Sequence, residues 1–168
     1  IVIPGRLNKE LCERVCQYLN VSAHPIIFSR FANGEIDIQI SPPVRHQIVF
    51  IVMSPYPELE EQLMELLFIV DAVRRAAAQR IVVILTLFPY SVDTRTVEEQ
   101  CLESRQTKLT RITEEQLERI QSGRFVADLM EESGVDEVVS LELCQPQWEG
   151  LFSIPFTNLA CNQILSSV

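Results

Sequence analysis

The first residues that could do chemistry lie in the stretch SRFANGEIDIQI, residues 29–40. A short turn containing Gly34 separates two apolar runs, and Phe31, Asn33 and Glu35 surround that turn. An aromatic ring can stack on a planar ligand, while an amide and a carboxylate can form hydrogen bonds with the ligand's edge. An aromatic ring beside a turn also commonly packs beneath its own hairpin, with the acid in water. The sequence therefore predicts a hairpin whose turn either only closes it or binds something outside the chain.

Two further candidate stretches directly follow predicted strands. LFPYSVDTR, residues 87–95, ends one apolar run, and LELCQPQWEG, residues 141–150, ends another. In parallel α/β sheets, ligands bind beyond the carboxyl ends of the strands. Neither stretch contains a glycine-rich phosphate loop, because the five glycines of the chain lie too far apart. A nucleotide would therefore have to be held in another way.

The elements that must position these residues alternate between strands and helices. Apolar runs predict strands, and amphipathic segments with capping signals predict helices. The strands are expected at 1–4, 48–53, 81–87 and 137–143, and the helices at about 7–19, 57–78, 113–133 and 158–165. This alternation predicts one α/β domain, a three-layer sandwich around a mostly parallel sheet.

The first predicted helix carries two sets of residues at a spacing of four. One set is apolar and consists of Leu7, Leu11, Val15 and Leu19. The other consists of Cys12 and Cys16, which we interpret as small core residues rather than as a redox couple. Asn8 is the expected N-cap of this helix.

Composition excludes several classes of function. The chain of 168 residues is 47% apolar and 22% charged, which is typical of a compact globule, and no run of 18 apolar residues predicts a membrane span. A net charge of −9 opposes non-specific binding to nucleic acid. Five cysteines without a CxxC pair predict neither a disulfide framework nor a zinc site. We therefore expect a cytoplasmic protein with reduced thiols, bound to neither a membrane nor nucleic acid.

Seven segments in order along the chain identify a family. They are RFANGEIDIQI, VR at 44–45, MELL at 64–67, VDAVRRAAAQRI at 70–81, FPY at 88–90, FVADLMEESGVDEVV at 125–139 and EGLFSIPFTNL at 149–159. Together they resemble the N-terminal half of ribose-phosphate pyrophosphokinase, or phosphoribosyl pyrophosphate synthetase. The resemblance implies a phosphoribosyltransferase-like N-terminal domain with a β-hairpin flap over residues 1–168, without the family's C-terminal half.

The resemblance also implies an activity and partners. The family transfers a diphosphoryl group from Mg-ATP to the anomeric hydroxyl of ribose 5-phosphate, and its subunits form oligomers. In such enzymes the hairpin turn reaches across a subunit boundary and holds adenine. By resemblance, Phe31 would stack on the base and Asn33 and Glu35 would bind its edge, in a homo-oligomer or beside a full-length synthetase.

This chain departs from the family pattern where the family grips phosphate. After FPY the family has an Arg-Gln pair that binds ATP phosphates and then Asp-Arg, whereas this chain has Val92, Asp93, Thr94 and Arg95. An apolar side chain and a carboxylate replace a guanidinium and a neutral amide, so affinity for phosphate should fall. Asp93 and Arg95 are still the candidate residues for binding the phosphate end of the nucleotide.

A second departure follows the later strand. The family has Asp-Leu-His there, with the His serving the metal and phosphate site, and this chain has Glu142, Leu143 and Cys144. Cys144 is the metal candidate by position, but Mg²⁺ prefers oxygen ligands, and the thiol can equally be a half-buried side chain at a strand end. Thr157 also stands where the family usually has Asp.

Three functions are compatible with these residues. The first is a catalytically impaired or regulatory homologue linked to phosphoribosyl pyrophosphate and nucleotide synthesis, and the second is the N-terminal part of an active diphosphokinase. The third is a module that binds a nucleotide, a sugar phosphate or a partner through Arg45, Arg74 and Arg75, which can also be solvated charges at helix ends. In each case we expect the chain by itself to be inactive.

Overall fold

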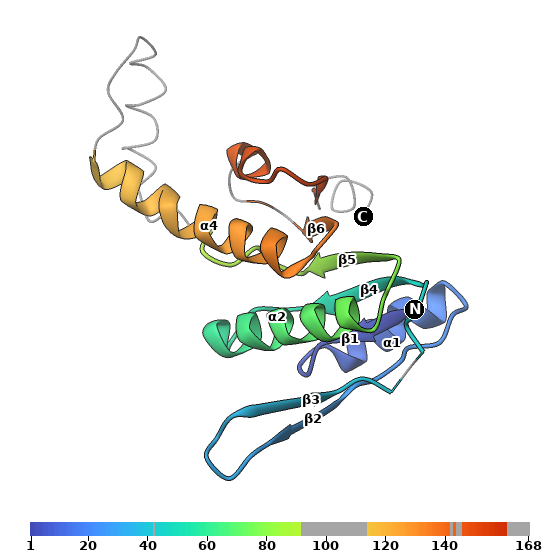
Figure 1. Cartoon of the computed structure of the whole chain (residues 1–168). Coiled ribbons are helices and arrows are strands. Elements are labelled where there is room, and N and C mark those ends of the chain that lie inside the picture. Colours follow the sequence, from blue (N-terminus) through green and yellow to red (C-terminus); the bar gives the residue numbers. More distant parts are fainter. Residues whose placement is uncertain (42, 92–113, 142, 144–145, 161–168) are drawn as a thin grey trace.

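A five-stranded parallel sheet forms the centre of the protein (Figure 1). The computed structural model describes residues 1–168 except 42, 92–113, 142, 144–145 and 161–168. The strands lie in the order β1, β4, β5, β6, β7, and every neighbouring pair is parallel. Their bounds are Val2–Pro4, Ile48–Met53, Arg80–Leu85, Glu137–Leu141 and Phe156–Leu159. All carboxyl ends therefore meet at one edge of the sheet, as the α/β prediction requires.

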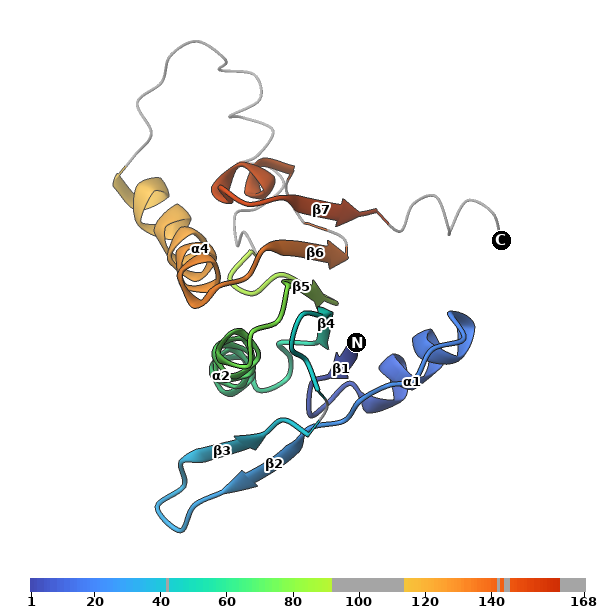
Figure 2. The same ribbon diagram turned by 45° about the vertical axis from the view of Figure 1, so that its right-hand side comes forward.

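Helices cover both faces of this sheet (Figure 2). Helices α2, Leu59–Arg75, and α4, Glu114–Ser133, pack on one face, and α1, Lys9–Tyr18, lies on the other face beside β1. A 3-10 helix, Pro146–Leu151, precedes β7. The predicted three-layer sandwich is confirmed. Within the described residues, no helix is long and apolar enough to cross a membrane.

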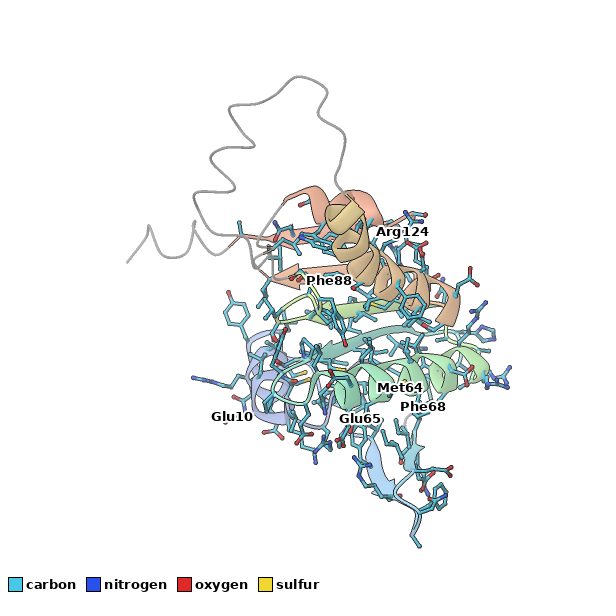
Figure 3. The ribbon with its side chains drawn as sticks, turned by 90° about the vertical axis from the view of Figure 1, so that its left-hand side faces the viewer. Glu10, Met64, Glu65, Phe68, Phe88 and Arg124 are labelled. Atoms are coloured by element: carbon cyan, nitrogen blue, oxygen red, sulfur yellow. The ribbon has the colours of Figure 1, made fainter. Side chains whose placement is uncertain are left out.

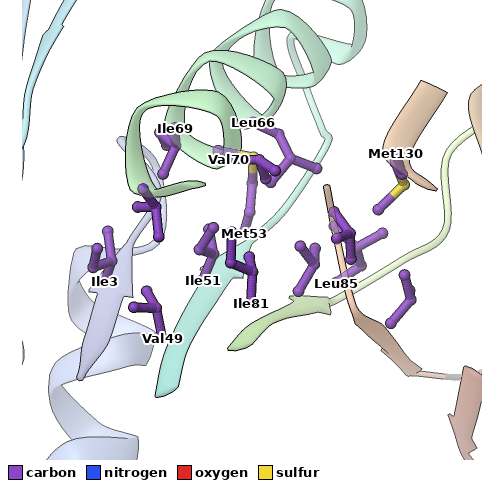
Figure 4. Close-up of a cluster of buried hydrophobic side chains, with 14 of the residues drawn as sticks. Ile3, Val49, Ile51, Met53, Leu66, Ile69, Val70, Ile81, Leu85 and Met130 are labelled. Atoms are coloured by element: carbon purple, nitrogen blue, oxygen red, sulfur yellow. The ribbon is translucent and has the colours of Figure 1, made fainter. Parts of the chain in front are cut away.

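The main core fills the space between the sheet and helices α2 and α4 (Figure 4). Ile51 and Leu85 from the central strands meet Ile69 of α2 and Met130 of α4, and all four side chains are at most 1% exposed. Burying one such side chain contributes about 1.5–3 kcal/mol. The central strands read as continuous apolar runs because the sheet is covered on both faces.

Helix α1 buries the face that carries its cysteines. Cys12 and Cys16 are at most 2% exposed and pack against Val52 of β4, whereas Leu11 is 40% exposed and Val15 is 37% exposed. The prediction that Cys12 and Cys16 are small core residues is confirmed. The spacing of the apolar residues correctly predicted a helix, but those residues do not form the face that packs most closely. The small thiols face the sheet, and the longer side chains lie at the margin of that contact.

One local prediction is confirmed and another was wrong. Asn8 is the N-cap of α1, as predicted, although its side chain makes no cap bond and its Oδ1 instead accepts the Ser54 amide at 2.6 Å. Asn158 does not begin a helix, because it lies in β7, where it pairs with Ser140 of β6. The β7 strand pairs with backbone groups of β6 that would otherwise be unpaired. The rest of that expected helix lies mostly outside the described residues.

Candidate functional site

Residues 27–39, which include Phe31, Asn33 and Glu35, form a separate two-stranded hairpin. Strand β2, Ile27–Arg30, pairs antiparallel with β3, Ile36–Gln39, and Arg30 lies opposite Ile36. The hairpin extends away from the sheet (Figures 1 and 2), and among the described residues no strand pair joins it to that sheet. The predicted hairpin is confirmed.

Backbone hydrogen bonds give the hairpin turn a defined shape. The Phe31 amide donates to the Glu35 carbonyl at 2.9 Å, and the Gly34 amide donates to the Phe31 carbonyl at 2.9 Å. Gly34 has a φ of 90°, in the region that favours glycine. The Asn33 side-chain oxygen accepts the Glu35 amide at 3.2 Å, which is a common turn contact. The turn is therefore an ordered platform for its side chains.

The turn presents its aromatic ring to the surroundings. Phe31 is 56% exposed, and Glu35 is also exposed. The ring does not pack beneath its own strands, which was the alternative reading of this sequence. The Asn33 side-chain oxygen accepts one hydrogen bond within the turn, and the amide NH₂ group of the same side chain is available to donate to a ligand. Contact of these three residues with adenine stays a prediction.

Arg30 fixes the turn to the body of the domain. Its Nη1 donates to the Gly34 carbonyl at 2.9 Å, and its Nη2 pairs with the Glu61 carboxylate of α2. Glu61 also accepts from Nη2 of Arg6 at 3.2 Å, and the same guanidinium pairs with Glu58. Two arginines and a row of acids on α2 thus join the hairpin to the end of β1.

The innermost acid of this row is Glu65, which lies on α2 beside the hairpin (Figure 3). Its side chain is 2% exposed, and it accepts from Arg6 Nε at 2.8 Å and from Gln62 Nε2 at 3.2 Å. Bonding to Glu58 and to Glu65 raises the pKa of Arg6, against an opposing effect of burial. A cavity of about 290 Å³ opens beside this network, lined by Arg6, Phe28, Ser29, Arg30, Ile36 and Glu65.

The chain leaving β5 is held tightly before it reaches the predicted phosphate contacts. Phe88 is fully buried and lies edge-on to Phe152 with a ring separation of 5.5 Å. The Ser91 hydroxyl donates to the Phe88 carbonyl at 2.7 Å. Asp93 and Arg95 follow immediately but lie outside the described residues.

Neither a metal site nor the proposed basic cluster is visible in the part of the chain that the structure describes. No three His, Cys, Asp or Glu side chains among those residues are placed to hold a metal ion. Cys144 lies outside them. Arg75 pairs with Asp71 at 2.7 Å, which raises the pKa of Arg75, and Arg74 donates to the Glu132 carbonyl at 3.2 Å. These two arginines thus serve helix ends, and Arg45 is simply exposed.

The family comparison agrees with the fold and the hairpin. Residues 1–134 match a family model described as the N-terminal domain of ribose phosphate pyrophosphokinase. The chain belongs to this family. The fold class and the resemblance inferred from the sequence are therefore confirmed.

Relatives with the family name match nearly the whole chain. A ribose-phosphate pyrophosphokinase of Agrobacterium fabrum is 37% identical, and one of Rhizobium meliloti is 36% identical, each over 98% of this chain and 47% of the relative. The crystal structure of phosphoribosylpyrophosphate synthetase from Mycobacterium smegmatis superposes with a TM-score of 0.79 at 30% identity, over 99% of this chain and 50% of that one. The chain thus spans about half the length of the relatives it matches.

Sequence reasoning missed the network of Arg6, Arg30, Glu61 and Glu65. Acids near the start of a helix commonly complement the helix dipole, and Arg6 lies more than 50 positions from the acids that it contacts. The available signal was the spacing of Glu58, Glu61 and Glu65, which places three acids on one side of a helix.

Proposed function

We propose that this chain is the adenine-binding half of a ribose-phosphate pyrophosphokinase-like subunit whose hold on phosphate is weak. In this proposal it is a catalytically impaired or regulatory homologue linked to phosphoribosyl pyrophosphate and nucleotide synthesis. The observation that carries the proposal is the exposed ring of Phe31 on an ordered turn. An exposed aromatic ring on a fixed backbone is suited to stacking on a planar ligand.

The turn offers complementary groups to an adenine base. Stacking of a base on an aromatic side chain contributes about 1–3 kcal/mol. Glu35 can accept a hydrogen bond from the exocyclic amino group, and the Asn33 amide NH₂ can donate to a ring nitrogen. These contacts recognise the base and do not touch the phosphates.

The phosphate side of the proposal rests on sequence. Val92 and Asp93 stand where the family has its phosphate-binding Arg and Gln, so only Arg95 offers a positive charge in that short stretch. Cys144 replaces a His of the family's metal and phosphate site, and a thiol is a poor ligand for Mg²⁺. Because diphosphoryl transfer depends on positioned charge, these replacements should remove most of the rate.

A binding titration tests the base contact. Calorimetry with adenosine should show weak binding, and Phe31→Ala should reduce the affinity by about 10-fold, as the loss of one stacking contact predicts. Phe125→Ala is a matched control, because Phe125 is 63% exposed on α4, far from the turn in sequence. Equal affinity of the wild type and Phe31→Ala would contradict the assignment.

The second candidate function is the N-terminal part of an active diphosphokinase. The observation in its favour is that the chain spans about half the length of its relatives. A coupled assay for AMP release from ATP and ribose 5-phosphate separates the two proposals when a full-length synthetase is measured with and without the chain. Added chain should raise the release per synthetase if it is part of an active diphosphokinase, and should not raise it if it is catalytically impaired. Self-association or pairing with such a synthetase is part of either proposal, and sedimentation should show a species heavier than the 19.2 kDa chain.

A further inference from the structure

The hairpin touches the body of the domain in two different ways. Near its base, Phe28 and Ile38 pack against the main core. Near the turn, the described contact with the body is ionic and runs from Arg30 to Glu61. Because an isolated two-stranded hairpin is only marginally stable, the position of the turn depends on these contacts.

Arg30 connects the turn to α2 with one side chain. One nitrogen of its guanidinium bonds the Gly34 carbonyl inside the turn, and another pairs with Glu61. Moving the turn away from α2 would break one of these two contacts. The orientation of the turn and the ion pair are therefore mechanically linked.

Glu61 is itself fixed from the other side. Arg6 bonds it at 3.2 Å and also bonds the buried Glu65 at 2.8 Å. A continuous set of charged contacts thus runs from a buried residue of α2 to the turn. Arg30 is 48% exposed and Glu61 is 34% exposed, so salt can screen this pair, whereas Glu65 at the other end of the set is 2% exposed.

We propose that the Arg30–Glu61 pair is a salt-sensitive latch that positions Phe31 for its ligand. The inference rests on the proposed function of the turn, and it assigns Arg30 and Glu61 as positioning residues for base recognition. When the pair is closed, the turn is held toward α2 and the ring of Phe31 has one orientation. When the pair opens, only the apolar base of the hairpin holds it, and the competent fraction of molecules falls.

The test compares Glu61→Gln with Glu60→Gln. Both substitutions remove one negative charge from the first turn of α2, but Glu60 is exposed and forms no ion pair among the described residues. Amide exchange measured by NMR without nucleotide reports on the Phe31 and Gly34 amides. We expect about 3- to 5-fold faster exchange in Glu61→Gln, which loses its pairs with Arg30 and Arg6, and wild-type exchange in Glu60→Gln.

Ligand titrations separate positioning from a general loss of structure. Adenosine should bind about 2- to 5-fold more weakly to Glu61→Gln than to the wild type. The variant's affinity for Mg-ATP should fall by the same factor, so the ratio of the two affinities stays at the wild-type value. Arg30→Lys, which keeps the charge for Glu61, should bind adenosine more tightly than Arg30→Gln. In the wild type, 0.5 M NaCl should reproduce the faster exchange.

The two proposals fail in different ways. Unchanged exchange in Glu61→Gln, or equal acceleration in Glu60→Gln, would overturn the latch. Faster exchange in a protein whose wild type does not bind adenosine would support the latch and overturn the proposed function of the turn.

Discussion

Replacement of Arg6 by Gln should destabilise the domain because it leaves Glu65 buried without its cationic partner. Glu65 is 2% exposed and receives one hydrogen bond from Arg6 and one from Gln62. After the substitution, the carboxylate keeps the hydrogen bond from Gln62 but loses its one cationic partner among the described residues. A buried charge that loses its partner costs more than the pair itself contributes.

The size of this destabilisation follows from how deeply Arg6 and Glu65 are buried. Breaking a fully buried pair costs about 3–5 kcal/mol, but Arg6 is 31% exposed, so water already screens part of this interaction. A hydrogen bond to a charged group contributes about 1.5–3 kcal/mol. We therefore expect Arg6→Gln to lower the free energy of unfolding by about 2–3 kcal/mol.

Two further variants show whether Arg6 and Glu65 stabilise the domain as a pair. Glu65→Gln removes the buried charge, and Arg6 keeps Glu58 and Glu61, so the loss should be about 1 kcal/mol. The double variant Arg6→Gln/Glu65→Gln should be more stable than Arg6→Gln, because no unpaired charge is left. Urea unfolding followed by circular dichroism measures all three. A double variant less stable than Arg6→Gln, or a cost below about 0.5 kcal/mol for Arg6→Gln, would refute the reasoning.

Two further predictions concern packing and pH. A Cβ at Gly123 of α4 would lie 2.1 Å from the ring of Trp148, which is 7% exposed. Gly123→Ala should therefore lower the free energy of unfolding by about 1–3 kcal/mol and shift the fluorescence emission of this single tryptophan to the red. Unchanged emission and an unchanged melting temperature would contradict the packing. Burial, with a smaller contribution from Cys16, raises the pKa of Cys12 from 9.0 to about 12. The stability from this thiol is therefore complete below pH 9 and falls by about 1.4 kcal/mol per pH unit between pH 9 and 12, where only the unfolded state ionises. Urea unfolding at pH 8, 9 and 10 should show a shallower decline in Cys12→Ala, and identical slopes would contradict it.

The sequence predicted the elements better than their contacts. The continuous apolar runs at 48–53 and 81–87 indicated strands covered on both faces, and the structure places both in the centre of the sheet. Helix α1 shows the limit of periodicity. The four-residue repeat of Leu11 and Val15 predicted the helix, but the face nearest to the sheet carries Cys12 and Cys16, because close approach to β4 selects small side chains.

The candidate site was predicted in part for a similar reason. Phe31 and Glu35 could be found because they flank a recognisable turn, and their exposure is a property that local sequence does not determine. Arg6 and Glu65 could not be paired from sequence, because 59 positions separate them and only the fold brings them together. Asp93, Arg95 and Cys144 depend on the family resemblance and lie outside the described residues.

The most direct test of the account is the ratio of the affinities for Mg-ATP and adenosine. Calorimetry should give nearly equal, weak binding of both ligands to the wild type, because Val92 and Asp93 supply no cationic contact to phosphate. Val92→Arg/Asp93→Gln should bind Mg-ATP about 10-fold more tightly and adenosine as before, as one charge-assisted bond to phosphate predicts. A wild-type protein that already binds Mg-ATP at least 10-fold more tightly than adenosine would contradict the weakened hold on phosphate.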